Sequence, residues 1–486
     1  MTKRVICASL VTGLLLAAPF GREVCRASET QTIEEMDLET AIDVILKKTE
    51  RETVAGYPLE ESFFLWLGSV YGDDMVEEIA RQVENGKMTV ADWHRLTGAS
   101  LHALYMQYCK DMGISNSKTE DVYWKDCKST DETVVSFTGD FNLAEGWSTT
   151  KYMESQPDGI YDCFSESLIQ EMQKSDVLVM NNEFVYSDGG EPLAGKAYTF
   201  RAKPEMIKNL EVFGTDLVTL ANNHTYDYGE QALKDTLHYL REEQIPYSGA
   251  GDNLKDASRI VSFIANGWKI SVVSATEIER SVKYTRQATE NDAGVLKTLE
   301  PEYFLGLIQK AKKTSDYTIV VCHWGTEGNL SHDMMQETLA YRFAQAGADA
   351  IIGGHPHRLQ GAAFVEGIPV AYSIGNFWFS DATLYTTVAQ IVISKEGDLT
   401  LKYLPCLQKD LTTSLITDTT EKEEFYHYLA AISKGIGIDA AGSVYDKTAE
   451  NYPAEQILYD SESSTTQIWG GIDNEGNAID IIGNRK

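Results

Sequence analysis

From about residue 131 to residue 375, short apolar runs alternate with amphipathic segments, and this alternation constrains the fold more than any other feature. Short apolar runs between polar turns are typical of buried strands, whereas a 3.6-residue period indicates helices. Strands that alternate with helices predict an α/β sheet that helices cover on both faces. The predicted strands are Thr133–Asp140, Asp176–Glu183, Asp216–Asn222, Lys269–Ala275, Tyr317–His323, Ala348–Gly353 and Pro369–Gly375, and the predicted helices are Pro204–Phe213, Gly229–Glu243, Pro301–Lys313 and Met334–Ala346.

The region from residue 28 to about residue 130 has a different pattern, which is helical and acidic. We expect Trp66, Trp93, Tyr105 and Tyr108 to pack its helices against one another, with ligand binding by these aromatic residues as the alternative. Thr89 is a plausible N-cap, because its side chain can accept a hydrogen bond from the first turn. The predicted helices are Glu34–Lys48, Met75–Asn85 and Thr89–Asp111.

After about residue 400 the alternation loosens. Glu421–Ser433 predicts one more helix, and Gln467–Ile482 could form a terminal hairpin around Asp473–Asn477. The predicted organisation is therefore a helical region over 28–130, an α/β domain over 131–385 and an extension over 386–486.

The first 27 residues read as an export signal. Lys3 and Arg4 precede an uncharged, mostly apolar run, Val5–Phe20, and Ala27 offers a small residue before a cut. Because this run of 16 residues is shorter than the ~20 that a spanning helix needs, we expect a cleaved signal peptide, with a retained anchor as the alternative. The protein is thus expected to be secreted or tethered at the extracellular face of a bacterial membrane, with no other membrane contact.

The charge balance excludes one class of partner. The chain has 73 acidic and 42 basic residues, a formal net charge of -31, so it repels phosphate backbones and is not expected to bind nucleic acid. Seven cysteines without a CxxC pair predict neither a zinc ribbon nor a disulfide framework, although Cys109 and Cys127 could form one bridge. Phosphate-loop, HExxH and GxSxG motifs are also absent from the sequence.

Polar side chains follow the ends of five predicted strands. Ligands of open α/β sheets bind beyond the carboxyl ends of the strands, so these side chains are expected to meet. Their oxygen and imidazole donors suit a divalent cation, and they outnumber the ligands of one tetrahedral ion. His355 and His357 are expected to face one cluster, since residues i and i+2 of an extended segment point the same way. The donors are Asp140, Asn142, Glu183, Asn223, His323, His355 and His357, and His332 lies near the same ends.

The order of these motifs resembles a known family. GDFN, NNE, LANNHTYDYG, HWGTEG, GGHPH and SIGNFWF are similar to motifs of poly-gamma-glutamate capsule synthesis (CapA-type) proteins, which belong to the calcineurin-like metallophosphoesterase superfamily. The resemblance covers roughly residues 131 to 385. It implies a metallophosphoesterase-like α/β sandwich, here with an N-terminal helical extension.

The resemblance also implies metal ligands, for two divalent ions that would be Mn, Fe or Zn. The superfamily's first motif is usually Asp-x-His, where this chain has Asp140-Phe141-Asn142, and its bridging carboxylate is usually Asp, where this chain has Glu183. These departures could weaken the first metal site. The implied ligands are Asp140 and His357 for the first metal, Glu183 as the bridge, and Asn223, His323 and His355 for the second.

By the same resemblance, His224 contacts the leaving group as a general acid and Asp227 orients it. The implied function is metal-dependent hydrolysis, by default of a phosphoester, in capsule metabolism. The substrate would be an anionic polymer or a small phosphoester. Two alternatives are a non-hydrolytic component of the capsule assembly or export machinery, and amide cleavage of the polymer by the same metal-activated water. Candidate substrate contacts are Asn142, Arg201, Glu327, Arg358 and Asn376.

Overall fold

The computed structural model describes residues 37–48, 60–85, 90–115, 120–278, 283–461, 471–472 and 478–479. The chain divides into two compact units, the first formed by Met1–Trp124 with Ile264–Ile270 and Lys313–Asp316, and the second by the remaining segments. The predicted signal segment lies outside the described residues. Within the described ranges, none of the helices combines the length and the apolar character that crossing a bilayer requires.

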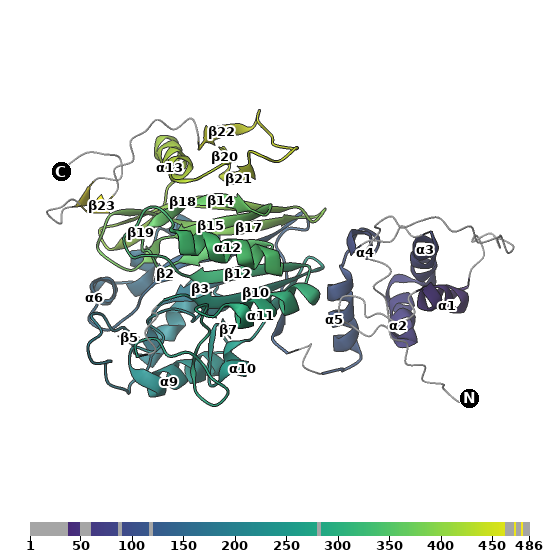
Figure 1. Ribbon diagram of the computed structural model, residues 1–486, viewed down its shortest axis with the longest axis horizontal. Coiled ribbons are helices and arrows are strands. Elements are labelled where there is room, and N and C mark those ends of the chain that lie inside the picture. The colour runs from purple at the N-terminus through teal and green to yellow at the C-terminus, as the bar shows by residue number, and fades with distance from the viewer. Residues whose placement is uncertain are drawn as a thin grey trace. The chain divides into compact units, whose positions relative to one another are not determined.

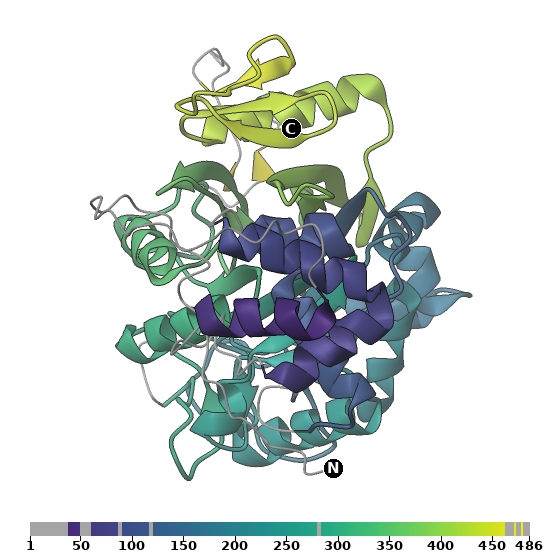
Figure 2. The same ribbon diagram turned by 90° about the vertical axis from the view of Figure 1, so that its right-hand side faces the viewer.

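The first unit is a small helical bundle, shown in purple and blue in Figure 2. Trp66, Trp93, Tyr105 and Tyr108 all lie in its buried core, so the predicted packing role of these four aromatic residues is confirmed. Its elements are α1 (Leu38–Lys48), α2 (Glu61–Tyr71), α3 (Asp73–Glu84), α4 (Val90–Thr97), α5 (Leu101–Asp111) and the short strand β1 (Val122–Trp124).

The predicted helix Thr89–Asp111 is interrupted in the structure. Gly98 adopts φ 76°, a left-handed conformation that ends α4, and the Ser100 hydroxyl accepts a hydrogen bond from the backbone N–H of Ala103 to start α5. The expectation of one continuous helix was wrong, because Gly98 ends the first helix and Ser100 caps the start of the second. Thr89 itself lies outside the described residues.

The second unit is built on two large β-sheets, beside short two-stranded pairs, rather than on the single sheet that the alternation predicted. In the larger sheet the order is β22-β20-β21-β18-β17-β2-β3-β6-β7, with β16 on β2 and β19 on β18. Its strands are β2 (Glu132–Phe141), β3 (Val177–Asn182), β6 (Leu217–Thr219), β7 (Tyr247–Ser248), β16 (Asn376–Trp378), β17 (Leu384–Ser394), β18 (Leu399–Lys409), β19 (Thr412–Leu415), β20 (Ile436–Asp439), β21 (Ser443–Asp446) and β22 (Ile457–Asp460).

The other sheet includes strands in the order β9-β10-β12-β13-β15-β14, of which residues 264–270, at the turn between β9 and β10, are counted in the first unit. All seven strands predicted over 133–375 are present, but three belong to the larger sheet and four to this one. The α/β sandwich that the resemblance implied is therefore confirmed. The strands of this sheet are β9 (Val261–Ala265), β10 (Trp268–Thr276), β12 (Tyr317–His323), β13 (Ala350–Gly354), β14 (Leu359–Val365) and β15 (Ile368–Ile374).

Helices cover the sheets through two apolar cores. Leu233, Leu237 and Leu240, the predicted stripe, are fully buried in the core of the larger sheet, while Phe304 and Phe343 of α11 and α12 pack on the other sheet. Figure 1 shows α11 and α12 lying along β10 and β12. The helices are α6 (Ser148–Ser155), α7 (Glu166–Gln173), α8 (Asn209–Phe213), α9 (Gly229–Glu242), α10 (Leu254–Ala257), α11 (Glu302–Lys313) and α12 (Met334–Ala346), with 3₁₀ turns at Gly159–Cys163 and Pro204–Lys208.

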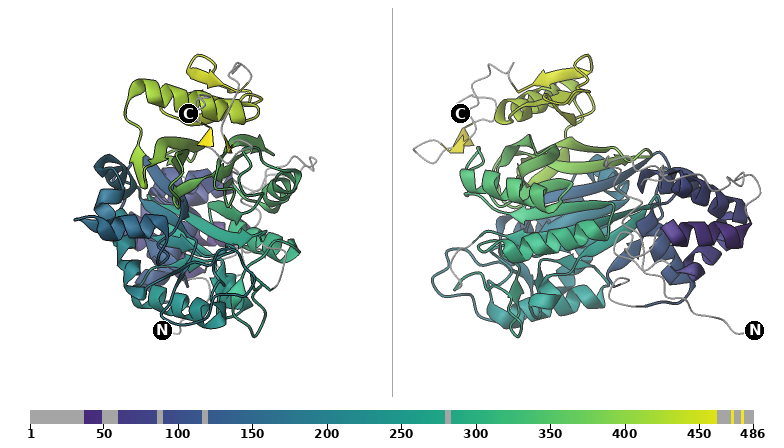
Figure 3. Two further views of the ribbon diagram at one scale, coloured as in Figure 1. Left: turned by 90° about the vertical axis from the view of Figure 1, so that its left-hand side faces the viewer. Right: turned by 45° about the vertical axis from the view of Figure 1, so that its right-hand side comes forward.

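The chain beyond residue 385 continues the larger sheet. β17 pairs antiparallel with β2, and α13 (Thr419–Ile432) packs on β14, β20 and β22. In the left view of Figure 3 this helix is the yellow-green one near the top. The described parts of the predicted terminal hairpin, β23 (Gly471–Ile472) and β24 (Ala478–Ile479), pair antiparallel. Short pairs β4 (Val185–Tyr186) with β5 (Arg201–Ala202) and β8 (Ala250–Gly251) with β11 (Gly294–Val295) complete the strands.

Cys163, Cys322 and Cys406 are free thiols, and no disulfide joins Cys109 to Cys127. The bridge considered between Cys109 and Cys127 is therefore wrong.

Two close backbone approaches bring the strand ends together. A Cβ atom on Gly139 would lie 1.8 Å from the backbone oxygen of Gly375, and one on Gly353 would lie 2.0 Å from that of Tyr372. Both positions accept only glycine, because real Cβ atoms do not approach so closely. Gly139 lets the backbone N–H of Asp140 donate to the backbone oxygen of Gly375 at 3.0 Å. This hydrogen bond fixes the position of the Asp140 backbone, from which its carboxylate extends.

Candidate metal centre

The predicted donors gather where the two sheets of the sandwich meet. Strand register sets their spacing: Asp140 lies opposite Asn181 on β3 and opposite Asn376 on β16, and His323 lies opposite Gly354 on β13. A small cavity between the sheets is lined by residues of both, including Asp140 and His323. The carboxyl ends of β2, β3 and β6 therefore face those of β12 and β13.

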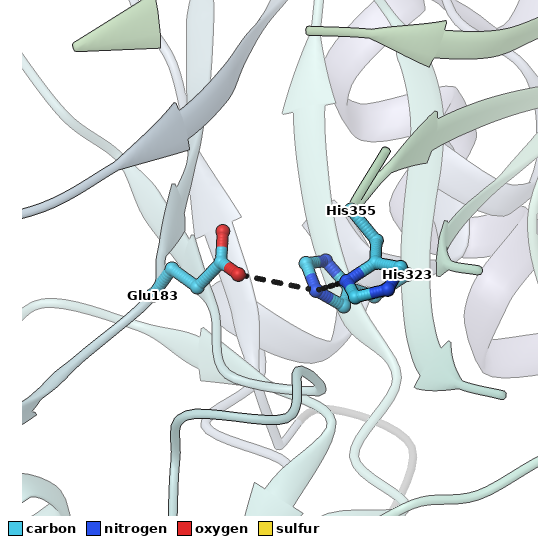
Figure 4. A group of neighbouring side chains, drawn as sticks. All are labelled: Glu183, His323 and His355. Carbon is cyan, nitrogen blue, oxygen red and sulfur yellow. Dashed lines mark hydrogen bonds and ion pairs between the residues drawn. The ribbon is translucent and has the colours of Figure 1, made fainter. Parts of the chain in front are cut away.

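One group of donors, which we call site A, consists of Glu183, Asn223, His323 and His355. His323 Nε2 lies 2.8 Å from Asn223 Oδ1, 3.2 Å from His355 Nδ1 and 3.4 Å from Glu183 Oε1. Figure 4 shows the Glu183 carboxylate pointing toward the two imidazoles. Three other ligand-type atoms thus lie within 3.4 Å of His323 Nε2.

Site A is buried and carries little positive charge. Glu183 is fully buried, and its Oε1 has no hydrogen-bond partner. Burial, followed by the nearby charge of Asp140, raises the pKa of Glu183 well above its ordinary value. Burial lowers the pKa of His323 to about 3 and that of His355 well below its usual range, so both rings are neutral at pH 7.

The second group, site B, consists of Asp140, Glu183 and His357, and it shares Glu183 with site A. Its ligand atoms lie within 4.8 Å of one another, as do those of Glu183, His323 and His355. His357 Nδ1 lies 3.1 Å from Asp140 Oδ2 and 2.8 Å from Asn376 Oδ1. Asp140 Oδ1 accepts a hydrogen bond from the side-chain amide of Asn181 at 2.8 Å.

The charges in site B compensate each other. Burial opposes ionisation of Asp140, but the hydrogen bond and charge of His357 outweigh it and lower the pKa of Asp140. Burial likewise opposes protonation of His357, but the hydrogen bond and charge of Asp140 raise the pKa of His357 above its ordinary value. Each residue therefore favours the charged form of the other.

His355 and His357 reach the centre by a different route from the predicted one. They follow β13 in a turn, where His355 adopts φ 98° and His357 φ 57°. The expectation of an extended segment was wrong, although both rings do face the cluster that sites A and B form around Glu183. Left-handed backbone, which is uncommon outside glycine, instead sends one ring to site A and the other to site B.

His224 and Asp227 form a hydrogen-bonded dyad beside site A. His224 Nδ1 lies 2.7 Å from Asp227 Oδ2, and His224 Nε2 lies 4.0 Å from Glu183 Oε1. Burial lowers the pKa of His224, although Asp227 acts in the opposite direction. The ring is thus oriented by Asp227 with its free nitrogen toward the shared carboxylate.

The donor set fits divalent cations. Hydrogen bonds among the four converging atoms of site A cannot satisfy all of them, because a neutral imidazole carries only one N–H. A buried carboxylate with an unpartnered oxygen is costly unless a positive charge lies nearby. Imidazole, amide and carboxylate donors together suit Mn, Fe or Zn. Sites A and B with a shared Glu183 could hold one ion each.

Comparison with known proteins identifies the family. The sequence pattern described as bacterial capsule synthesis protein PGA_cap matches residues 134–381, just over half of the chain. The chain belongs to this family. The capsule resemblance predicted from the motifs is therefore confirmed.

Two Bacillus proteins are similar to the same region. The chain is 33% identical over 251 residues to the capsule biosynthesis protein CapA of Bacillus anthracis, covering 50% of this chain and 60% of that protein. It is 34% identical over 208 residues to the PGA biosynthesis protein CapA of Bacillus subtilis, covering 42% of this chain and 54% of that protein.

A more distant relative, from Mycobacterium tuberculosis, is named a probable polyglutamine synthesis accessory protein. It is 26% identical over 215 residues, covering 43% of this chain and 57% of that protein. The chain thus spans less than two thirds of the length of each of these relatives.

Asn142, the departure from the superfamily's Asp-x-His motif, does not offer its oxygen to site B. Asn142 Oδ1 accepts a hydrogen bond from the backbone N–H of Ala144 at 2.7 Å, closing a local turn, and its buried Nδ2 has no hydrogen-bond partner. An amide nitrogen is a donor and not a metal ligand. The prediction of Asn142 among seven metal donors is therefore not supported by its contacts, and its role toward substrate stays a prediction.

The four other predicted substrate contacts have different surroundings. Arg201 donates to the backbone oxygens of Gly189 and Gly190 and lies 4.5 Å from the Tyr228 ring. Asn376 bonds His357, and Glu327 is exposed on the loop after β12, close enough to affect the pKa values of Glu183 and His357 through its charge.

Arg358 follows His357 directly, and its guanidinium makes no hydrogen bond or ion pair with any described residue. Burial lowers the pKa of Arg358, whereas the nearby Tyr428 of α13 raises it. His332, which the sequence placed near the strand ends, lies outside both sites: its ring stacks on Tyr372 at 3.7 Å and its Nε2 lies 3.1 Å from Glu337.

Sequence reasoning missed four residues that contact the centre. Asn181 donates to Asp140, Phe200 packs 4.4 Å from the His224 ring, and Phe379 packs 4.4 Å from the His357 ring. Lys196 pairs with Asp227 at 2.6 Å. The motif NNE contains Asn181 and the motif SIGNFWF ends at Phe379, so both residues lay inside quoted motifs although no contact with the centre was assigned to them. Lys196 stands in a loop, where no periodicity marks a side chain as buried.

Proposed function

We propose that this protein is an exported, divalent-metal-dependent hydrolase of capsular polymer metabolism, with phosphoester cleavage as its reaction. The observation that supports it is Glu183, a fully buried carboxylate whose atoms belong to both candidate metal sites. Bound there, divalent ions would supply a water of lowered pKa and stabilise developing charge on a substrate oxygen.

The residues of the chain would perform the remaining tasks. Asp140 and His357 hold one side of the centre, while Asn223, His323 and His355 hold the other. His224 would hold a proton at Nε2 for the departing oxygen, since Nδ1 is hydrogen bonded to Asp227. Two aromatic rings pack against these imidazoles, Phe200 against His224 and Phe379 against His357.

Hydrolysis can be tested on purified protein loaded with manganese or zinc. The substrates are aryl phosphomonoesters, aryl phosphodiesters and γ-glutamyl polymers, so that ester and amide cleavage are separated. We expect the parent and His332→Ala to cleave a phosphoester and His323→Ala to lose both bound metal and activity. Equal rates with and without metal would contradict the proposal, and cleavage of the γ-glutamyl polymer alone would replace the ester with an amide.

The names of the relatives favour a second candidate, a non-hydrolytic component of the polymer synthesis or export machinery. Two are named biosynthesis proteins and one a synthesis accessory protein. The net charge of -31 opposes direct binding of a polyanion except where cations bridge the two. A strain without the native copy distinguishes the candidates: His323→Ala restores polymer formation if the role is non-hydrolytic, and fails to do so if catalysis is required.

Export to the cell surface is supported by the sequence of the first 27 residues alone. We expect mass spectrometry of protein from the producing cell to find a new N-terminus after Ala27. An intact N-terminus in a membrane fraction would instead indicate the retained anchor, and an intact N-terminus in the cytosol would contradict export.

A further inference from the structure

A buried ammonium connects the two functional parts of the centre. Lys196 Nζ donates to the backbone oxygen of Asn223, a site A residue, and to Asp227 Oδ1, the latter over 2.6 Å. The Lys196 side chain is only 5% exposed and that of Asp227 is fully buried. Removing two charges from water is costly unless their geometry and further hydrogen bonds compensate, and here both partners make further hydrogen bonds, Lys196 to Asn223 and Asp227 to Phe200.

The pair determines which oxygen of Asp227 faces His224. Because Lys196 occupies Oδ1, Oδ2 is left to accept from His224 Nδ1 and from the backbone N–H of Phe200, both at 2.7 Å. Both carboxylate oxygens are thereby used, and rotation of the carboxylate would break three hydrogen bonds. The His224 ring is held with Nε2 toward Glu183.

The loop that carries Lys196 is itself anchored to this network. Between β4 and β5 the chain has no helix or strand, yet the backbone N–H of Leu193 donates to the backbone oxygen of Asp227 at 2.9 Å. The Tyr284 hydroxyl donates to the backbone oxygen of Gly195, the residue before Lys196, also at 2.9 Å. After Lys196, the backbone N–H of Phe200 donates to Asp227 Oδ2, so backbone contacts hold the loop on both sides of the lysine.

We propose that Lys196 is a positioning residue for the His224–Asp227 dyad: its ammonium holds the Asp227 carboxylate, and through it the imidazole that protonates the leaving group. This inference rests on the proposed hydrolytic function and names a residue that the family motifs did not mark. Lys196 touches neither the substrate nor the reacting atoms in this role.

The first test uses two methyl aryl phosphodiesters that differ only in the leaving group, 4-nitrophenol or phenol. Phenolate is the poorer leaving group, so its departure depends more on a proton from His224. We expect Lys196→Met to lower kcat for the phenyl ester by roughly tenfold to a hundredfold, and for the nitrophenyl ester by about threefold or less, with KM and metal content unchanged. Lys196→Arg should restore most of the difference, and Lys203→Met, which alters an exposed lysine of the same region, should match the parent.

The second test does not depend on activity. In protein with ¹⁵N-labelled histidine, the hydrogen-bonded Nδ1 proton of His224 should give a downfield resonance in the parent and in Lys196→Arg. We expect this resonance to be lost or shifted in Lys196→Met. Should Lys196→Met not fold, Lys196→Gln takes its place with the same expectations.

Outcomes against the inference are distinct from failure of the proposed function. Equal losses for the two esters, a fall in metal content, or an unchanged His224 resonance in Lys196→Met would overturn the positioning role. If the parent cleaves neither ester, the proposed function fails, and the resonance alone then decides whether Lys196 holds the dyad.

Discussion

Sites A and B share the carboxylate of Glu183, yet their buried polar groups differ in how far they are paired within the protein. In site A, two neutral imidazoles, an amide oxygen and an unpartnered Glu183 oxygen face one another. In site B, Asp140 and His357 neutralise each other, and Asn181 and Asn376 complete their hydrogen bonds.

This difference indicates an order of metal binding. A cation that binds at site A would give the unpartnered Glu183 oxygen and the neighbouring nitrogen and amide oxygen atoms a positive charge to contact. It would not have to break an ion pair. A cation entering site B must first separate Asp140 from His357, whose mutual attraction is part of the folded state. We therefore expect site A to bind the first ion more tightly and site B to bind the second ion more weakly. The departure at Asn142, whose oxygen is already used, points the same way.

The largest effect is expected from His355→Ala, which removes a direct donor from site A. Loss of residues that merely support a ligand costs about 10–100-fold in metal affinity, so loss of a ligand itself should cost roughly a hundredfold or more. Isothermal titration with manganese, together with elemental analysis after dialysis, measures this loss. His332→Ala is the matched control, because His332 lies outside both sites. If His355→Ala retained the metal content of the parent, site A would not be the tighter metal site.

Asp140→Asn tests the internal ion pair of site B. Breaking a buried pair by removing one partner costs about 3–5 kcal/mol, and we expect about 2 kcal/mol here because the His357 side chain is 20% exposed. Urea unfolding in the presence of a chelator measures the change, with Asp158→Asn at an exposed position as the control. The tight ion at site A should remain. If stability without metal were unchanged, the two sites would not differ in the way described.

Asn376→Ala is expected to have a smaller effect on site B alone. Asn376 Oδ1 lies 2.8 Å from His357 Nδ1 and orients that ring, but Asp140 still contacts the same nitrogen. We expect the second ion to bind about tenfold more weakly, the low end of the range for a supporting partner, while the first ion is unaffected. Titration calorimetry resolves the two steps. Equal weakening of both steps would mean that the sites act as one.

The smallest effects concern the two arginines considered as substrate contacts. Arg358 adjoins site B in sequence and has no ionic partner among the described residues, whereas the Arg201 guanidinium is already bonded to two backbone oxygens. An exposed or half-buried charge contributes up to about 1 kcal/mol, so we expect Arg358→Ala to raise KM for an anionic ester about threefold. Arg201→Ala should change KM by less than about twofold. The reverse ranking would place the substrate on the Arg201 side.

Much of the fold was predictable because strands and helices carry local periodicity. All seven predicted strands between residues 133 and 375 are present, and the Leu233–Leu237–Leu240 stripe is buried as expected. The break between α4 and α5 at Gly98 and Ser100 was missed, although Gly commonly ends helices and Ser commonly caps their first turn. The division of the strands between two sheets was invisible to periodicity, because a buried strand reads alike in either sheet.

For the centre, residue types and their order determined that Asp140, Glu183, Asn223, His323, His355 and His357 would be candidate donors, since they follow strand ends in the chain. Only the tertiary structure decided which of them meet. Pairing within each sheet and the facing of the two sheets set distances between residues as far apart as Asp140 and His357. The same holds for Lys196, whose burial and charge partner depend on how a loop without periodicity folds back onto Asp227. The local sequence determines which side chains can bind a metal or carry a proton. Which of these side chains meet depends on packing between segments that are far apart in the chain.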